Sequence, residues 1–309
     1  MSRLEAALQR AATGVVAACP TFDPGIEAQE PMPVPEAALV RNEASRAHSR
    51  RAVVEPPIEP FERHERLEDE EEPRFHAFNA KHMEKLIVSP TMSPSLREHY
   101  RRLGAMLHHA QAESGLKTLM LSSALPAEGK TLTATNIALT LSESYERRVL
   151  LIDADLRRPS LHDIFQLPKV FGLNEALTSV PERRVSLIQV SRLLSLLPAG
   201  TPHPDPMSML TSDRMKRLLA EATAAFDWVI IDTPPVGILT DAKLLSNMVG
   251  AALLVIRAGK TPAAMVQKAV DALGRNRIMG VVLNQAEPRH GRRSDYYYGA
   301  YYYSSPRRA

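Results

Sequence analysis

The sequence is poor in cysteine and has no long apolar run. Cys19 is the only cysteine among 309 residues, which excludes an internal disulfide framework and is typical of a reducing compartment. No stretch approaches the roughly 18 apolar residues of a membrane span, and the start, MSRLEAALQR, lacks the apolar core of a signal peptide. We therefore expect a cytoplasmic protein.

The net charge is small and aromatic residues are few. A formal net charge of +3 does not indicate a nucleic-acid binder, so we expect no nucleic-acid partner. Aromatic residues make up 5% of the chain, yet six of its eight tyrosines fall between Tyr296 and Tyr303 without any Leu, Ile, Val or Phe beside them. A folded core would mix these types, so we expect residues 289–309 to form a flexible, basic tail.

The sequence before this tail divides into three segments. Residues 1–18 place apolar side chains on one helical face, which predicts a short amphipathic helix that docks on a partner, lies on a membrane surface or merely frays. Residues 19–88 contain many prolines and an acidic run, Glu65–Glu72, and cannot bury enough apolar surface to offset their chain entropy. We expect them to be a disordered linker before an ordered domain over residues 89–288.

From residue 93 onward, apolar runs of strand length alternate with helical patterns. This alternation predicts an α/β fold, with a mostly parallel sheet and helices on both faces. In such a sheet, functional sites lie at the carboxyl ends of the strands. The expected helices are residues 93–110, 129–146, 156–165, 207–225, 241–248 and 263–273, and the expected strands are residues 117–123, 148–153, 193–200, 227–232, 251–259 and 277–285.

The segment SSALPAEGKTLTATNIA lies where the first of these strands turns into a helix. Its spacing resembles a P-loop, in which backbone N–H groups and a helix N-terminus surround phosphates. We expect Lys130 to reach the β- and γ-phosphates and the Thr131 hydroxyl to hold Mg²⁺. Ala124 stands where the strict pattern has its first glycine, so an ordinary helix start after a strand is the alternative. The expected nucleotide-binding residues are Pro126, Ala127, Glu128, Gly129, Lys130, Thr131 and Leu132.

Carboxylates end two other apolar strands. In VLLIDADLRRPSLH, Asp153 and Asp155 lie on the same side of a strand end, where paired carboxylates suit Mg²⁺ binding and proton abstraction from a hydroxyl. Alternatively, Asp155 caps the helix that follows. In FDWVIIDTPPVGILTDA, Asp232 has the form of a Walker B acid. Structural aspartates are common at strand ends, but three such pieces in this order predict a nucleotide site.

These motifs resemble the bacterial tyrosine kinases of capsule and exopolysaccharide export, in their separate cytoplasmic form. PAEGKT, LLIDADLRRP, LLPAGTPHPDPMSML, DWVIIDTPP and GVVLN follow the order of that family, and a tyrosine cluster ends the chain. The resemblance covers about residues 89–309 and implies a P-loop NTPase fold of the partitioning-ATPase type. Neither HRD nor DFG of the eukaryotic protein kinases is found.

The resemblance implies an ATP-dependent autokinase that regulates exopolysaccharide or capsule synthesis and export. Lys130 would be the phosphate lysine and Thr131 a magnesium ligand. Asp153 would contact the metal shell and activate the attacking phenol, Asp155 would support it, and Asp232 would be the Walker B carboxylate. The expected acceptors are Tyr296, Tyr297, Tyr298, Tyr301, Tyr302 and Tyr303.

The sequence departs from the family pattern at two positions. The family usually reads Pro-Gly-Glu-Gly-Lys, but Ala127 replaces its first glycine, which costs roughly 1 kcal/mol if that position needs a positive φ. The family also joins subunits through a Glu-x-x-Arg-x-x-Arg pattern, of which Glu98 and Arg101 are present but the third position is Gly104. After the last strand, Asn284 occupies a place where relatives often contact adenine.

The family also implies partners for this chain. These are a membrane-embedded chain-length regulator, which would hold the protein at the inner face of the membrane, a cognate tyrosine phosphatase and further copies of the chain. From Asn284 to Tyr296 the chain extends at most about 40 Å, at roughly 3.3 Å per residue, which permits phosphorylation in cis or in trans. Unmodified tails would dock into neighbouring active sites, and about −1.5 to −2 charges per phosphate would expel them. The N-terminal segment resembles a tether, as in autokinases of exosortase-type export systems.

Two other functions stay open at this stage. A partitioning-type ATPase would switch its dimerisation with nucleotide, although such proteins usually start their P-loop with Lys-Gly-Gly, and SALPAEGK has no lysine before Lys130. A non-catalytic nucleotide-binding scaffold is the second, because Ala124 and Ala127 replace glycines in the loop. The tail itself could instead stack on single-stranded nucleic acid or associate simply by sticking.

Overall fold

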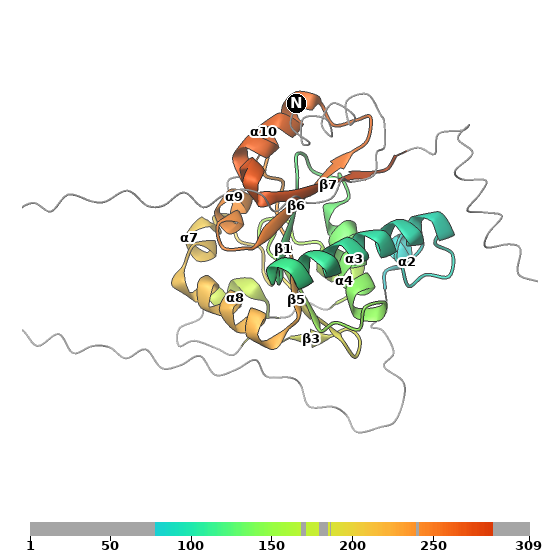
Figure 1. Ribbon diagram of the computed structural model, residues 1–309. Coiled ribbons are helices and arrows are strands. Elements are labelled where there is room, and N and C mark those ends of the chain that lie inside the picture. The colour runs from blue at the N-terminus through green and yellow to red at the C-terminus, as the bar shows by residue number, and fades with distance from the viewer. Residues whose placement is uncertain (1–77, 168–170, 179–184, 186, 239–240, 287–309) are drawn as a thin grey trace, which may run out of the picture.

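Seven strands form one sheet at the centre of the protein (Figure 1). The computed structural model describes residues 78–167, 171–178, 185, 187–238 and 241–286. The order across the sheet is β3-β4-β2-β5-β1-β6-β7, and every neighbouring pair is parallel except β3 and β4. The strands are β1 (Thr118–Ser123), β2 (Val149–Asp153), β3 (Ile188–Gln189), β4 (Leu194–Leu197), β5 (Trp228–Asp232), β6 (Ala251–Arg257) and β7 (Ile278–Asn284). The expected α/β fold with a mostly parallel sheet is confirmed.

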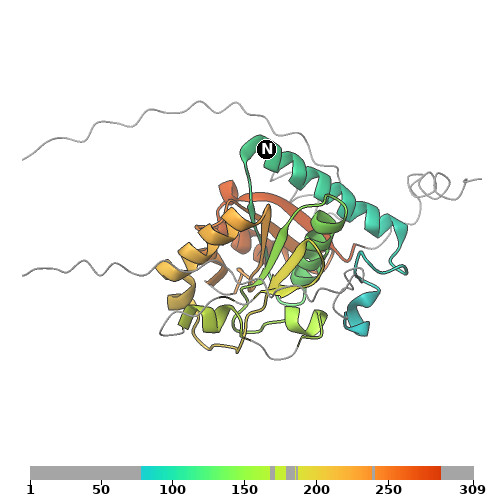
Figure 2. The same cartoon turned by 90° about the horizontal axis from the view of Figure 1, so that it is seen from below.

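Helices cover both faces of this sheet, as predicted. In Figure 2, the long α3 and the yellow-orange α8 lie on opposite sides of the strands. The helices are α2 (Ala80–Met83), α3 (Pro94–Ser114), α4 (Lys130–Glu143), α5 (Leu161–Ile164), α6 (Leu173–Thr178), α7 (Met207–Leu210), α8 (Asp213–Ala225), α9 (Asp241–Ser246) and α10 (Ala263–Leu273), with a 3₁₀ turn at Arg275–Arg277. Within the described ranges, no helix is both long enough and apolar enough to cross a membrane.

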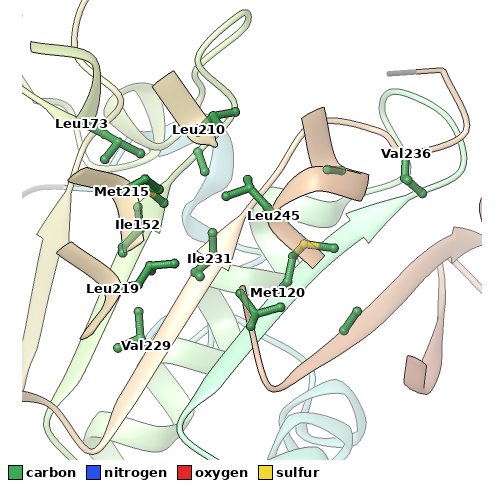
Figure 3. Packing of buried hydrophobic residues seen from close by; sticks show 14 of the residues in the cluster. Met120, Ile152, Leu173, Leu210, Met215, Leu219, Val229, Ile231, Val236 and Leu245 are labelled. Atoms are coloured by element: carbon green, nitrogen blue, oxygen red, sulfur yellow. The ribbon is translucent and has the colours of Figure 1, made fainter. Parts of the chain in front are cut away.

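Two apolar clusters, one on each face, explain why the central strands read as unbroken apolar runs. On one face, Met120, Ile152 and Ile231 pack against α8 through Met215 and against α9 through Leu245 (Figure 3). The alternate residues of the same strands point to the other face, where they meet α4 and α5. Successive side chains of a strand point to opposite faces, so a strand that is covered on both sides needs apolar residues at every position.

Two predicted helices are wrong in their extent. The helix expected over residues 156–165 is only α5, because Pro159 would remove a hydrogen bond and clash inside a longer helix. The helix expected over residues 207–225 is broken into α7 and α8 at Thr211 and Ser212. The Ser212 side chain accepts the N–H of Met215 at 3.2 Å, which is the preferred bond of an N-cap serine and starts a new helix. Two other helices end two or three residues early, α4 at Glu143 and α9 at Ser246.

The ordered domain begins earlier than the boundary expected at residue 88/89. The Phe78 ring lies 5.3 Å from the Phe165 ring between centroids, and Leu86 is fully buried. Asn79 also donates its backbone N–H to the Ile164 carbonyl at 2.9 Å. Residues 78–88 therefore pack on the domain and are not linker. The helix predicted for residues 1–18, the linker up to residue 77 and the tyrosine tail lie outside the described residues.

Candidate nucleotide site

The phosphate loop, residues 124–129, joins the end of β1 to the start of α4 near the middle of the sheet. Gly129, with a φ of 88°, is the N-cap residue of α4 and has no side chain to bond the first N–H groups of the helix. Unpaired N–H groups and the helix dipole favour an anion at that point. The local backbone thus has the form of a phosphate site.

Ala127 adopts the conformation that the family pattern would assign to glycine. Its φ is 61°, in the left-handed region. From the sequence we expected a cost if this position needs a positive φ, and it does. For a residue with a Cβ atom this conformation costs about 1–2 kcal/mol, so the loop carries local strain.

Lys130 lies at the bottom of the loop and contacts the carboxylate of β5. Its ammonium nitrogen is 2.7 Å from Asp232 Oδ1 and 3.4 Å from Thr131 Oγ1. The Lys130 side chain is 8% exposed and that of Asp232 is fully buried. The other oxygen of Asp232, Oδ2, is buried without a hydrogen-bond partner. A buried carboxylate oxygen without a donor is unfavourable, so the site has capacity for a cation there.

Asp153 and Asp232 are opposite each other in the register of β2 and β5. Asp153 is buried, and its carboxylate accepts the N–H groups of Ser160 and Leu161 at 3.0 Å each and that of Asp155 at 3.2 Å. Burial, reinforced by the Asp232 charge, raises the pKa of Asp153 to about 7. Two carboxylates near one ammonium group leave the centre with excess negative charge when both are ionised, which favours a proton or a metal ion.

Asp155 lies next to this pair but has a local partner of its own. Its carboxylate accepts the backbone N–H of Arg158 at 3.1 Å and thereby closes the turn that precedes Pro159. Burial raises the pKa of Asp155 as well. The alternative that it caps the next helix is wrong, because α5 starts only at Leu161.

Two hydroxyl residues at the site were not singled out from the sequence. Ser160 Oγ lies 3.0 Å from Thr131 Oγ1, and the Ser160 N–H holds Asp153. Thr261, in the turn after β6, donates its hydroxyl to the Glu128 carboxylate. Hydroxyl residues in loops belong to no periodic pattern that sequence analysis could detect. The folding of the sheet brings these two residues to the phosphate loop.

Asn284, the last residue of β7, contacts the phosphate loop. Its side-chain N–H donates to the Glu128 carbonyl at 2.8 Å, and its side-chain oxygen accepts the N–H of Gln285 at 2.9 Å. A Cβ atom placed on Gly129 would lie 1.9 Å from Asn284 Nδ2, so Gly129 is required by this contact as well as by its φ. The adenine contact expected of Asn284 stays a prediction.

Gly104 explains the break in the family's subunit-joining pattern. A Cβ atom at this buried position would lie 2.7 Å from the Tyr145 ring and 2.9 Å from the Thr140 methyl group. Tyr145 covers α3 here and donates its hydroxyl to the Arg101 carbonyl at 3.0 Å. Glu98 pairs with Arg102, at 3.5 Å, on the same helix. An arginine at residue 104 would have to displace Tyr145.

Known proteins resemble this chain in sequence and in fold. Residues 127–299 match the CobQ/CobB/MinD/ParA nucleotide binding domain family. Tyrosine-protein kinase YwqD of Bacillus subtilis (strain 168) is 37% identical over 210 residues, which cover 65% of this chain and 86% of the relative. The solved kinase domain of Escherichia coli tyrosine kinase ETK superposes with a TM-score of 0.60 at 30% identity, over 74% of this chain and 89% of that one. The solved chimerical protein CapA2B2 gives a TM-score of 0.60 at 28% identity, over 70% and 95%.

Fold and site together define a P-loop nucleotide-binding protein of the CobQ/CobB/MinD/ParA type. Within that class, the chain belongs to the bacterial tyrosine kinase family. It is a tyrosine autokinase of the kind involved in capsule and exopolysaccharide synthesis. The resemblance noted from the sequence is confirmed at the level of the family.

Proposed function

We propose that this protein transfers the γ-phosphoryl group of Mg-ATP to the tyrosines of its own C-terminal segment, residues 289–309. One observation carries the proposal: Lys130, Asp153 and Asp232 converge beside the phosphate loop at the carboxyl edge of the sheet. The strand that leads to the tyrosines ends at that same edge, because Asn284 contacts the loop. The strand that precedes the acceptor segment thus ends next to the phosphate site.

The side chains present suit a magnesium–nucleotide complex. Asp153, Asp232 and the Thr131 hydroxyl offer hard oxygen atoms, and one Asp232 oxygen has no donor. The described part of the chain has no group of three or more His, Cys, Asp or Glu arranged to hold a metal alone, so phosphate oxygens would complete the coordination. When bound, Mg²⁺ would neutralise charge that develops on the transferred phosphoryl group.

Each residue of the site has a role in this proposal. The backbone N–H groups of Ala127 to Leu132 and the Lys130 ammonium would bind the phosphates, and Pro126, which has no N–H, would shape the loop. Lys130 would leave Asp232 and bind a phosphate oxygen instead. Asp153 would accept the proton of the attacking tyrosine hydroxyl: burial and the Asp232 charge raise its pKa in the metal-free protein, and bound Mg²⁺ would keep the carboxylate ionised and able to act as the general base. Asp155 would hold the turn that delivers Ser160 to Asp153.

A docking area for a partner is inferred at the same edge of the sheet. Phe171, Met207 and Ile238 are exposed apolar residues in segments that follow the carboxyl ends of β2, β4 and β5. We assign them to the docking area of a membrane-embedded chain-length regulator, which would bring the kinase to the inner face of the membrane. CapA2B2, one of the solved structures that this chain resembles, is a chimerical protein.

The remaining assignments concern regulation. Unmodified tails would dock into neighbouring copies and stabilise an oligomer, and phosphorylation would expel them until a tyrosine phosphatase restores them. The segment before residue 78 would act as a tether, as in the exosortase-associated subgroup. Sedimentation before and after ATP treatment tests the first point, and an unchanged assembly state at full tail phosphorylation would refute it.

Labelled ATP tests the reaction itself. The full chain is incubated with γ-labelled Mg-ATP, and the phosphate is mapped by mass spectrometry. We expect phosphotyrosine in residues 296–303, lost in Lys130→Met and retained in the control Lys216→Met, which removes an exposed lysine of α8. Free phosphate alone would identify a partitioning-type ATPase, and no turnover despite nucleotide binding would identify a scaffold.

A further inference from the structure

We propose that Thr261 and Asn284 are positioning residues that clamp the phosphate loop in its nucleotide-binding conformation. Both act through Glu128, and each comes from a strand at the far side of the loop, Thr261 after β6 and Asn284 at the end of β7. The inference depends on nucleotide binding at the loop, and it rests on the proposed function only where kinase activity is the readout.

The contact from Thr261 fixes the Glu128 side chain. Glu128 is 3% exposed, and its carboxylate accepts the N–H of Leu125 at 2.8 Å and the Thr261 hydroxyl. Thr261 is itself held in a tight turn, in which its hydroxyl accepts the Arg257 N–H at 2.9 Å and its own N–H donates to the Arg257 carbonyl at 3.1 Å. The buried carboxylate thus ties the start of the loop to the end of β6. Removal of the hydroxyl would leave a buried charge with one donor fewer.

The contact from Asn284 fixes the backbone at the same residue. Its amide donates to the Glu128 carbonyl and packs against the Cα atom of Gly129 so closely that no Cβ atom fits between them. The Asn284 backbone carbonyl in turn accepts the Ala258 N–H at 2.9 Å, which joins β7 to the turn that bears Thr261. Glu128 is therefore held at its side chain by Thr261 and at its carbonyl by Asn284, two residues that a backbone hydrogen bond joins into one unit.

The strain at Ala127 gives this clamp its function. A left-handed alanine persists only where the surrounding structure over-determines its conformation, whereas glycine adopts it freely. The next residue, Glu128, is anchored at both carboxylate oxygens and at its carbonyl. These three anchors compensate for the missing glycine, so that the loop N–H groups stay aimed at the phosphates.

Because the loop contacts phosphates in ground state and transition state alike, loss of the clamp should weaken nucleotide affinity more than the chemical step. For Thr261→Val we expect about a tenfold rise in the Kd for Mg-ADP, measured by calorimetry, and a similar rise in KM for ATP with kcat changed less than threefold. Thr261→Ser keeps the hydroxyl and should bind within about twofold of the original protein. Thr223→Val is the control, because that hydroxyl bonds only within α8.

Two further variants separate positioning from folding. Asn284→Leu nearly keeps the size of the side chain and adds no charge, but it loses the donor to Glu128, and it should also weaken Mg-ADP binding about tenfold. Ala127→Gly removes the strain from the loop. The double variant Ala127→Gly/Thr261→Val should therefore bind Mg-ADP at least threefold more tightly than Thr261→Val alone. This rescue also decides the case in which Thr261→Val alone does not fold.

The proposal is overturned if folded Thr261→Val binds Mg-ADP as tightly as the original protein. It is equally overturned if Thr261→Ser is as weak as Thr261→Val, or if Ala127→Gly restores nothing. Mg-ADP binding needs no phosphoryl transfer, so a protein that binds ADP in this pattern but never labels its tyrosines would refute the proposed function and keep the clamp.

Discussion

The buried carboxylate pair predicts that the protein loses stability as the pH rises from 5 to 8 in the absence of magnesium. Burial and the neighbouring Asp232 raise the pKa of Asp153 to about 7 in the folded protein, compared with about 3.9 in an unfolded chain. The folded state therefore binds this proton more tightly. Its contribution to stability is complete below pH 4 or so and is lost as the pH rises through about 7.

The size of the effect follows from the two pKa values. A difference of about 3 pKa units, at about 1.4 kcal/mol per unit, sets a limit of about 4 kcal/mol over the whole titration. Between pH 5 and 8, about 2–3 kcal/mol of this should be lost. Three N–H groups, from Asp155, Ser160 and Leu161, already favour the charged form, so the pH dependence arises from what burial and Asp232 impose beyond them.

Urea unfolding at several pH values in EDTA measures this loss. The control Asp271→Asn, which removes an exposed carboxylate of α10, should keep the slope. Asp153→Asn should remove most of the slope, whatever its absolute stability, and leave the part that the raised pKa of Asp155 contributes. Added Mg-ADP should flatten the slope of the original protein, because a bound cation favours the charged carboxylate. A free energy of unfolding that stays constant or rises from pH 5 to 8 would refute the reasoning, as would an equal slope in Asp153→Asn.

Three glycine exchanges give further predictions. Ala127→Gly should raise the free energy of unfolding by about 0.5–1 kcal/mol in urea, because relief of about 1–2 kcal/mol of strain exceeds the added entropy of the unfolded chain; no gain would contradict the φ of 61°. Gly129→Ala should weaken Mg-ADP binding more than tenfold in calorimetry, because its Cβ atom meets the Asn284 amide, and unchanged affinity would exclude that contact. Gly104→Arg restores the family pattern but should lower stability by about 1–3 kcal/mol, because Tyr145 must move; sedimentation shows whether assembly improves, and full stability would disprove the packing described.

The sequence was sufficient for the parts of the fold that depend on regular patterns. Apolar runs predicted the strands. Because the carboxyl ends of parallel strands lie at the same edge of a sheet, Asp153 and Asp232 were expected to lie at one edge, and the register of β2 and β5 confirms it. Pattern failed where one side chain changed the backbone. Pro159 moved the start of a predicted helix to Leu161, and Ser212 divided another by capping its second half. Proline is a common helix breaker and serine a common N-cap residue, but the predicted helices followed the apolar periodicity, which continues across both positions.

The contacts that hold the phosphate loop could not be predicted, because they come from residues remote in sequence. The family resemblance pointed to Asn284 for an adenine contact but not to its bond with Glu128. Thr261 lies 133 positions after Glu128, and Asn284 lies 156 positions after it. Their contact depends on the order of the strands, with β6 and β7 on the same side of β1. A single sequence gives the direction of the strands but not this order, because every central strand has the same apolar composition. Without the strand order, the hydrogen-bond partners of polar side chains at the strand ends and in the loops cannot be predicted.

The place of β7 relates the phosphate loop to the tyrosine tail. β7 is one of the two edge strands of the sheet; it runs parallel to β6, and its carboxyl end therefore lies on the side of the sheet where the loop lies. Asn284 holds the Glu128 carbonyl through its side chain and the N–H of Gln285 through its oxygen, and Gln285 has a φ of 54°. The residue that leads into the tail is thus fixed by the same amide that fixes the loop. Under the proposed function, a tail that docks into a neighbouring copy and pulls on Gln285 would change the nucleotide affinity of its own chain through Asn284, without touching the ATP of that chain.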